Sequence, residues 1–120
     1  MAGTDDDGKP RAAGVAVEAP PVDILGRGDS LLLRVILPGV PKENIEVMVE
    51  PRRVTITASR PAREERGVYH LHEQSLSTSY WRTVELPAPV DREGVRARLH
   101  NGVLELTLPL IGRKRRVEIH

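Results

Sequence analysis

Residues 97–104 read Ala-Arg-Leu-His-Asn-Gly-Val-Leu, with Asn101-Gly102 between two runs in which apolar and polar residues alternate. A period of two is typical of a strand that buries one face. Asn-Gly accepts positive φ at both central positions of a type I′ turn, whose twist suits a two-residue hairpin. The stretch therefore predicts an antiparallel hairpin with a defined register. The apolar positions of the two runs are Val95, Ala97, Leu99, Leu104, Leu106 and Leu108.

The composition limits the kinds of protein that this chain encodes. Its 120 residues suggest one domain with a modest core, and the absence of cysteine excludes disulfides and thiolate metal sites. The 18 Lys and Arg residues nearly balance the 17 acidic ones, so no general field favours nucleic acid. Phenylalanine is absent, and only Tyr69, Tyr80 and Trp81 are aromatic. We therefore expect an aliphatic core and no platform for base stacking.

The N-terminal segment differs in composition from the rest of the chain. Residues 1–20 are rich in Gly, Ala, Pro and Asp, which bury too little apolar surface to offset their ordering entropy. We expect a disordered arm there. No apolar run approaches the roughly 18 residues that span a bilayer, and no signal-peptide core is present. The expected location is therefore the cytoplasm.

Short apolar or alternating runs, separated by Pro and Gly, continue from Pro21 to the hairpin. Runs of this kind are typical of strands. About eight strands without a convincing helix predict an all-β fold, an immunoglobulin-like β-sandwich over residues 21–110, with a short C-terminal extension over 111–120. The strands expected before the hairpin are Val22–Leu25, Ser30–Leu37, Asn44–Glu50, Val54–Ala58, Val68–Glu73 and Ser79–Leu86.

Four motifs follow one another between Pro21 and Ile119. They are Leu37-Pro38-Gly39-Val40 with Glu43-Asn44-Ile45-Glu46-Val47, Tyr80-x-Arg82 before Leu86-Pro87, Ala97-x-x-x-Asn101-Gly102-Val103-Leu104, and Val117-Glu118-Ile119. In this order they resemble the α-crystallin domain of the small heat-shock proteins, the Hsp20 family. The resemblance implies an ATP-independent holdase, a chaperone that binds unfolding proteins and prevents their aggregation, working as an oligomer of homodimers.

A second hypothesis is a co-chaperone-like or adaptor β-sandwich that binds a folded partner and has weak or no holdase activity. In the family, the arm that holds clients is usually longer and rich in Phe, so the aromatic-free residues 1–20 favour this alternative. The terminal Val-x-Ile motif favours the holdase, since co-chaperone relatives end in acidic tails. An inactive subunit that assembles with a longer paralogue is a third hypothesis.

The C-terminal motif has two interpretations. Val117 and Ile119 project to the same side of an extended strand, as a two-pronged peptide suited to adding at a sheet edge would. From the spacing alone, a last strand that packs on its own domain is equally expected. The resemblance favours an oligomer anchor. It also implies that the receiving groove, which also takes clients, lies between the strand of Ile45, Val47 and Val49 and the strand of Val95 and Ala97. The sequence leaves open which of these side chains line the groove and which fill the core.

The resemblance further implies that Val68–Glu73 is a strand exchanged between two subunits, pairing with the partner's equivalent of Val22–Leu25. Exchange hides two sheet edges that would otherwise invite aggregation. The alternative is an internal hairpin with Ser79–Leu86. Arg82 lies among apolar neighbours and needs a carboxylate or carbonyl partner, unless it is solvated. The residues expected at the dimer interface are Val22, Ile24, Val68, Tyr69, Leu71 and Arg82.

The remaining polar motifs point to no chemistry. His70 and His72 share one face of a predicted strand, a spacing that suits a transition metal, but no third ligand can be named. The basic run Arg113–Arg116 is interpreted as a solvated linker rather than a nucleic-acid patch. The chain has no Gly-x-Ser-x-Gly elbow, phosphate loop or His-Glu-x-x-His. We therefore predict no enzyme activity, cofactor or metal, and partners that are neither nucleic acid nor membrane.

Overall fold

The Asn101-Gly102 turn joins β9 (Arg96–His100) to β10 (Val103–Pro109) in the computed structural model. The φ angles of the two turn residues are 50° and 76°, both in the left-handed region that a type I′ turn requires. The two strands pair antiparallel with no residue skipped at the turn. The predicted hairpin is therefore confirmed. The structure describes residues 3–4, 10–11, 16–62, 65–73, 78–111 and 119.

Gly102 is required both by its positive φ and by a close backbone neighbour. A Cβ atom at this position would lie 3.2 Å from the Cα atom of Pro38, whereas one at Gly28 (φ 59°) would meet nothing within 4 Å. We expect Gly28→Ala to lower the free energy of unfolding by about 1 kcal/mol through φ strain alone. Gly102→Ala should cost at least about 1 kcal/mol more, because backbone cannot move aside as a side chain can. Urea denaturation of both variants measures the difference, and equal losses would contradict the expectation.

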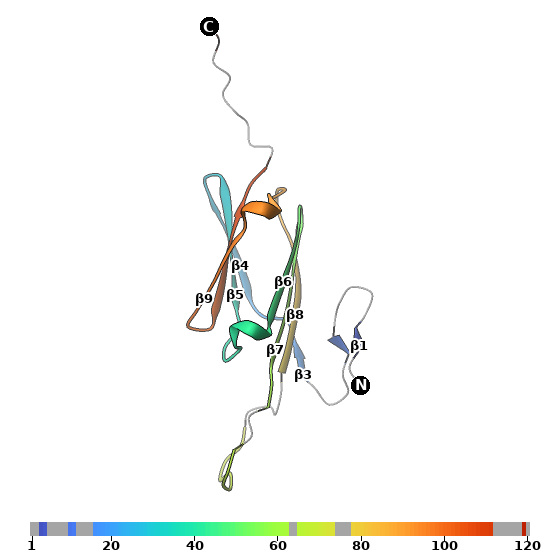
Figure 1. The fold of residues 1–120 in the computed structure, drawn as a ribbon, viewed down its shortest axis with the longest axis vertical. Coiled ribbons are helices and arrows are strands. Elements are labelled where there is room, and N and C mark those ends of the chain that lie inside the picture. The colour runs from blue at the N-terminus through green and yellow to red at the C-terminus, as the bar shows by residue number, and fades with distance from the viewer. Residues whose placement is uncertain are drawn as a thin grey trace.

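Two four-stranded sheets pack face to face and form a β-sandwich (Figure 1). The other strands are β1 (Gly3–Thr4), β2 (Pro10–Arg11), β3 (Ala16–Glu18), β4 (Val22–Arg27), β5 (Ser30–Ile36), β6 (Ile45–Glu50), β7 (Arg53–Arg60) and β8 (Thr78–Glu85). One sheet has the order β4-β5-β10-β9 and the other the order β3-β8-β7-β6, while β1 and β2 pair separately. Only β3 is parallel to its neighbour among these described strands.

Two single-turn 3-10 helices, η1 (Lys42–Asn44) and η2 (Arg92–Gly94), lie where the chain crosses from one sheet to the other. The chain passes through η1 between β5 and β6, and through η2 between β8 and β9. In η2 the side chain of Asp91 accepts a hydrogen bond from the backbone N–H of Glu93 at 3.0 Å, which caps the turn. Both crossovers therefore place an edge strand, β6 or β9, directly after a short tight turn.

The space between the sheets is filled by aliphatic side chains, as the composition predicted. Strands of both sheets contribute, because every second residue of β5, β7 and β10 faces inward. Tyr80 is the one aromatic residue in the buried core among the described residues. The side chains with no exposed surface are Leu33, Val35, Leu37, Val54, Ile56, Leu106 and Leu108. The predicted all-β sandwich is confirmed.

The last residues of the arm expected over residues 1–20 make contacts with the sandwich. Ala16–Glu18 form β3 alongside β8, and Pro20 is fully buried. The Pro20 carbonyl accepts a hydrogen bond from Nη1 of Arg82 at 3.1 Å, and the Pro21 carbonyl accepts one from the backbone N–H of Ile36 at 3.1 Å. Composition did not reveal this order, because it comes from hydrogen bonds to distant strands. The ordered domain therefore begins near Ala16 rather than Pro21.

Candidate functional site

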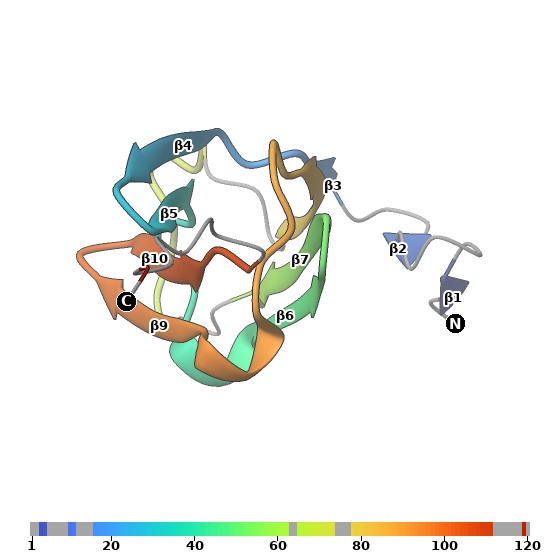
Figure 2. The ribbon, with the colours of Figure 1, turned by 90° about the horizontal axis from the view of Figure 1, so that it is seen from above.

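The two sheets end in edge strands on the same side of the sandwich. Figure 2 shows β6 and β9 along one side and β3 and β4 along the other. Among the described strands, each end strand has a hydrogen-bonded neighbour on one side only, so its other backbone edge can accept a further strand. We call the side formed by β6 and β9 the β6/β9 edge.

The β6/β9 edge carries a strip of half-buried aliphatic side chains. Ile45, Val47 and Val49 on β6 alternate with exposed residues, and all three pack against the core. From the other sheet, Val95 just before β9 and Leu99 within it are also half-buried against the same core. These side chains help to close the core and still keep accessible surface. We call these five residues the apolar strip.

The strip includes the three residues named from sequence as a groove: Ile45, Val47 and Val95. Sequence alone left open whether they line a groove or fill the core, and half-burial means that they do part of both. Leu99 was missed as a member of the strip, although its place in the alternating run before Asn101-Gly102 was the signal for it. Ala97, on the same strand, is exposed.

The β4 strand forms a second open edge on the opposite side. Its only strand neighbour among the described residues is β5, and Val22 and Ile24 lie opposite Val35 and Leu33 in the ladder. Ile24 retains 38% of its surface and Leu25 retains 43%. The strand therefore offers both unpaired backbone and apolar surface where the dimer contact was predicted.

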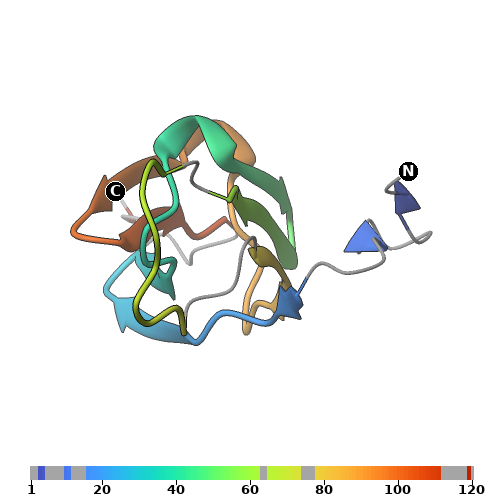
Figure 3. The ribbon, with the colours of Figure 1, turned by 90° about the horizontal axis from the view of Figure 1, so that it is seen from below.

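The segment 65–73 contains no strand in this single chain, contrary to the strand expected over Val68–Glu73. It projects from one end of the sandwich (Figure 1), and Figure 3 views the molecule from that end. The internal hairpin with β8 is also absent, because β3 and β7 occupy both sides of the start of β8, at Thr78–Tyr80. A hairpin with this segment would begin there, and the start of β8 leaves it no free edge.

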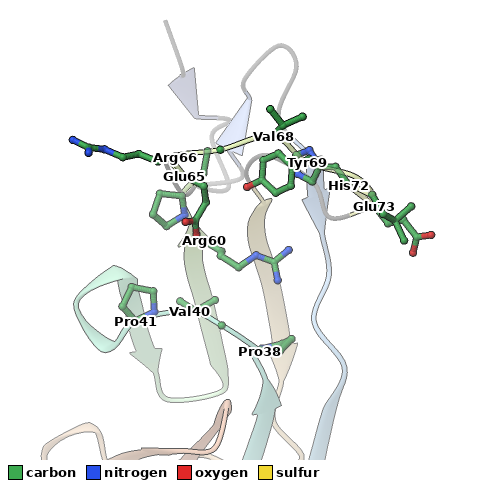
Figure 4. A pocket seen from close by; sticks show the side chains of 15 residues that line it. Pro38, Val40, Pro41, Arg60, Glu65, Arg66, Val68, Tyr69, His72 and Glu73 are labelled. Atoms are coloured by element: carbon green, nitrogen blue, oxygen red, sulfur yellow. The ribbon is translucent and has the colours of Figure 1, made fainter.

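Apolar side chains of this segment are strongly exposed. Val68 exposes 82% of its surface, Leu71 75% and Tyr69 55%. The Tyr69 ring stacks on His72 with centroids 4.2 Å apart and planes 9° from parallel. Figure 4 shows this segment across a pocket from the Pro38–Pro41 turn, with the Arg60 side chain between them.

Arg82 finds its partner within its own subunit. The residue is half-buried on the inward-facing side of β8, opposite Ile56 in the ladder. Its guanidinium donates to the Pro20 carbonyl at 3.1 Å, which meets the need for a carbonyl partner inferred from sequence. In this chain Arg82 therefore holds the N-terminal segment against β8. A contribution of Arg82 to a dimer interface stays a prediction.

The two candidate metal ligands, His70 and His72, are exposed. Within the described ranges, no group of three or more His, Cys, Asp or Glu residues is arranged to hold a metal ion. The same part of the chain contains no helix that is both long and apolar enough to cross a bilayer.

The C-terminal motif is only partly described. Val117 lies outside the described residues, while Ile119 exposes 95% of its surface. The chain leaves the sandwich after Leu110 and Ile111, whose backbone N–H groups donate to the carbonyls of Asp29 at 2.8 Å and Pro89 at 3.1 Å. Ile119 is thus not an inner residue of its own subunit.

Comparison with known proteins gives a family match over most of the chain. The model of the Hsp20/alpha crystallin family matches residues 23–120. Spore protein SP21 of Stigmatella aurantiaca is 37% identical over 92 residues, which cover 75% of this chain and 54% of that protein. Heat shock protein 16 of Schizosaccharomyces pombe is 30% identical over 97 residues, covering 78% of this chain and 67% of the relative. The chain thus spans about half the length of spore protein SP21.

Two solved structures with the same fold are matched by this chain over nearly their whole length. Heat shock protein 16.0 from Schizosaccharomyces pombe matches with a TM-score of 0.68 and 28% identity, over 85% of this chain and 98% of the solved one. The hspA protein from Xanthomonas axonopodis matches with a TM-score of 0.63 and 30% identity, over 79% of this chain and 94% of the other. The two sheets described above are therefore shared with these proteins.

Proposed function

Because this chain belongs to the Hsp20/alpha crystallin family, we propose that it is an ATP-independent holdase chaperone. The apolar strip of the β6/β9 edge is the observation that supports this most directly. Proteins that unfold expose apolar segments and unpaired backbone, and these associate with one another. An edge strand beside half-exposed aliphatic side chains offers such a segment both hydrogen bonds and apolar contact. Binding there lowers the free concentration of the aggregating species.

The C-terminal motif of a neighbouring subunit competes for the same strip. Val117 and Ile119 enter it as an added strand, and burial of two such side chains contributes roughly 3–6 kcal/mol before ordering costs. The 95% exposure of Ile119 in the single chain supports docking on another subunit. Assembly and client capture then use one surface, so release of the anchor uncovers the binding site.

The building block of the assembly is a dimer made by strand exchange. The segment Val68–Glu73 of one subunit adds to the β4 edge of its partner, next to Ile24. Two features support this: the exposed apolar side chains of the segment, and the open edge of β4 with 38% of Ile24 uncovered. Exchange would pair the segment of one subunit with the β4 edge of the other, so that neither is left with unpaired backbone.

A heated model client tests the holdase with two matched variants. The wild-type protein should suppress light scattering of the client at equimolar subunits without nucleotide. Val47→Glu places a charge in the apolar strip and should abolish most of that protection. Met48→Glu is the control, because Met48 is the next residue of β6, faces the other way and is 56% exposed.

Circular dichroism first establishes that both variants keep the β-sheet content of the wild-type protein. Scattering that stays unchanged with the wild-type protein would refute the holdase. Equal protection by Val47→Glu and Met48→Glu would instead move the client site away from the β6/β9 edge.

A further inference from the structure

The β6/β9 edge has walls of opposite charge. Glu46 and Glu50 of β6 are exposed, because they alternate with the residues of the apolar strip and face away from it. On the other wall, Arg96 and Arg98 of β9 are exposed. The outer faces of the two edge strands therefore carry opposite charge, and we call them the acidic wall (β6) and the basic wall (β9).

The two carboxylates of the acidic wall are available to an outside partner. Arg53, which lies opposite Glu50 in the ladder, is instead paired with Glu85 through Nε and Oε1 at 2.9 Å. Among the described residues, neither Glu46 nor Glu50 makes a side-chain hydrogen bond or an ion pair. Two uncompensated negative charges therefore lie on the outer face of β6, opposite the face that carries the apolar strip.

This chain carries a segment with the complementary charge directly before its anchor. The run Arg-Lys-Arg-Arg occupies residues 113–116, immediately before Val117. We propose that this run, from a second copy of the chain, docks against Glu46 and Glu50 when Val117 and Ile119 enter the apolar strip. The inference rests on the anchor proposed above, and it adds a charge contact that draws the docked segment to β6 rather than to β9.

The lengths agree with this arrangement. At about 3.3 Å per residue, an extended segment from Arg113 to Ile119 covers about 20 Å, and β6 covers about 17 Å. Glu46 and Glu50 are separated by about 13 Å along the strand, and the basic run by about 10 Å from first to last residue. One extended segment can therefore place Val117 and Ile119 in the strip and, on its other face, Lys114 and Arg116 beside the carboxylates. Glu118 lies on that face as well, so the two cations outweigh one carboxylate there.

The basic wall excludes the opposite placement. Arg96 and Arg98 repel a cationic run, so the extension is drawn to β6 rather than β9. A client segment without such a run gains only the apolar contact. The charges therefore favour the anchor over clients at low salt and lose that advantage when salt screens exposed pairs.

Charge exchange tests this in the full-length protein. Glu46→Lys/Glu50→Lys should raise the midpoint concentration for assembly about tenfold, since each exposed pair contributes modestly. Lys114→Glu/Arg116→Glu should do the same, because these two residues lie on the face opposite Val117, and the four substitutions together should restore assembly to within about threefold of wild type. Dilution series by native mass spectrometry or mass photometry give these midpoints.

The control changes the same charge elsewhere on the same sheet. Glu18→Lys, on β3 at the opposite edge of the sheet, should leave the midpoint within about twofold, because exposed charges away from the β6/β9 edge contribute little. In about 1 M salt, where the Debye length is about 3 Å, the differences among all these variants should vanish.

The outcomes separate this inference from the anchor itself. If Val117→Gly/Ile119→Gly breaks the assembly and Glu46→Lys/Glu50→Lys does not, the anchor stands and the charge contact is refuted. Failure of the four-substitution protein to recover also refutes it, because restored attraction is its specific signature. If the glycine variant has no effect either, both proposals fall.

Discussion

Val117→Gly/Ile119→Gly should reduce the assembled protein to particles of two 13.3-kDa chains with unchanged β-sheet content. Glycine removes the two side chains whose burial contributes roughly 3–6 kcal/mol per contact, and it adds chain freedom that docking must suppress. The sandwich itself should not change, because Ile119 is 95% exposed in its own subunit. Native mass spectrometry measures the particle and circular dichroism measures the fold.

His120→Gly is the matched control for this experiment. It adds the same backbone freedom one residue beyond the motif and leaves the side chains of Val117 and Ile119 in place, so its particles should keep the wild-type mass. An unchanged mass for Val117→Gly/Ile119→Gly would refute the anchor. A wild-type protein that is monomeric at every concentration would refute the assembly altogether and favour an adaptor.

Leu106→Ala and Leu33→Ala should each lower the free energy of unfolding by about 2–5 kcal/mol, the largest single-site losses that we expect. Both side chains have no exposed surface, and they lie opposite each other on β10 and β5. Truncation removes buried methyl groups and leaves a cavity between closely packed strands. A domain of this size has only about 5–15 kcal/mol in total, so either variant brings it near the limit of folding.

Urea denaturation should be measured in the Val117→Gly/Ile119→Gly background, so that unfolding is not coupled to disassembly of the larger oligomer, and at one fixed protein concentration, because dissociation of the dimer remains coupled to unfolding. Met48→Ala is the control, because Met48 is 56% exposed and should change stability by no more than about 0.5 kcal/mol. The double variant Leu33→Ala/Leu106→Ala should cost less than the two single losses together, since both enlarge one cavity. A loss below about 1 kcal/mol for either single variant would mean that the core collapses around the gap.

Features encoded by neighbouring residues were predictable from the sequence. The hairpin follows from Asn101-Gly102 and the alternation beside it, which depend on local φ preferences and a period of two. The sandwich follows from the number and spacing of such runs. The apolar strip was half predictable: alternation identified Ile45 and Val47 as one face of a strand. That this face is only half-buried depends on where the second sheet ends.

Features that depend on a distant edge were not predictable. Ala16–Glu18 looked disordered because its composition offers little apolar surface, yet it is ordered by the open side of β8, more than 50 residues away in the chain. Val68–Glu73 has strand-like composition but forms no strand here, since every edge that it could reach along its own chain near β8 is occupied. In both cases the availability of an edge, rather than local propensity, decides the structure.

The short β3 strand also bears on how such a protein avoids becoming fibrous itself. Molecules that present long bare strands at high concentration risk stacking without limit into amyloid-like fibrils. Here β3 covers the start of β8 with only three residues, and Pro20 and Pro21 follow at once. Neither proline has an N–H group, so the hydrogen-bond ladder cannot lengthen past Ala19. That border is therefore a poor template for the addition of further strands.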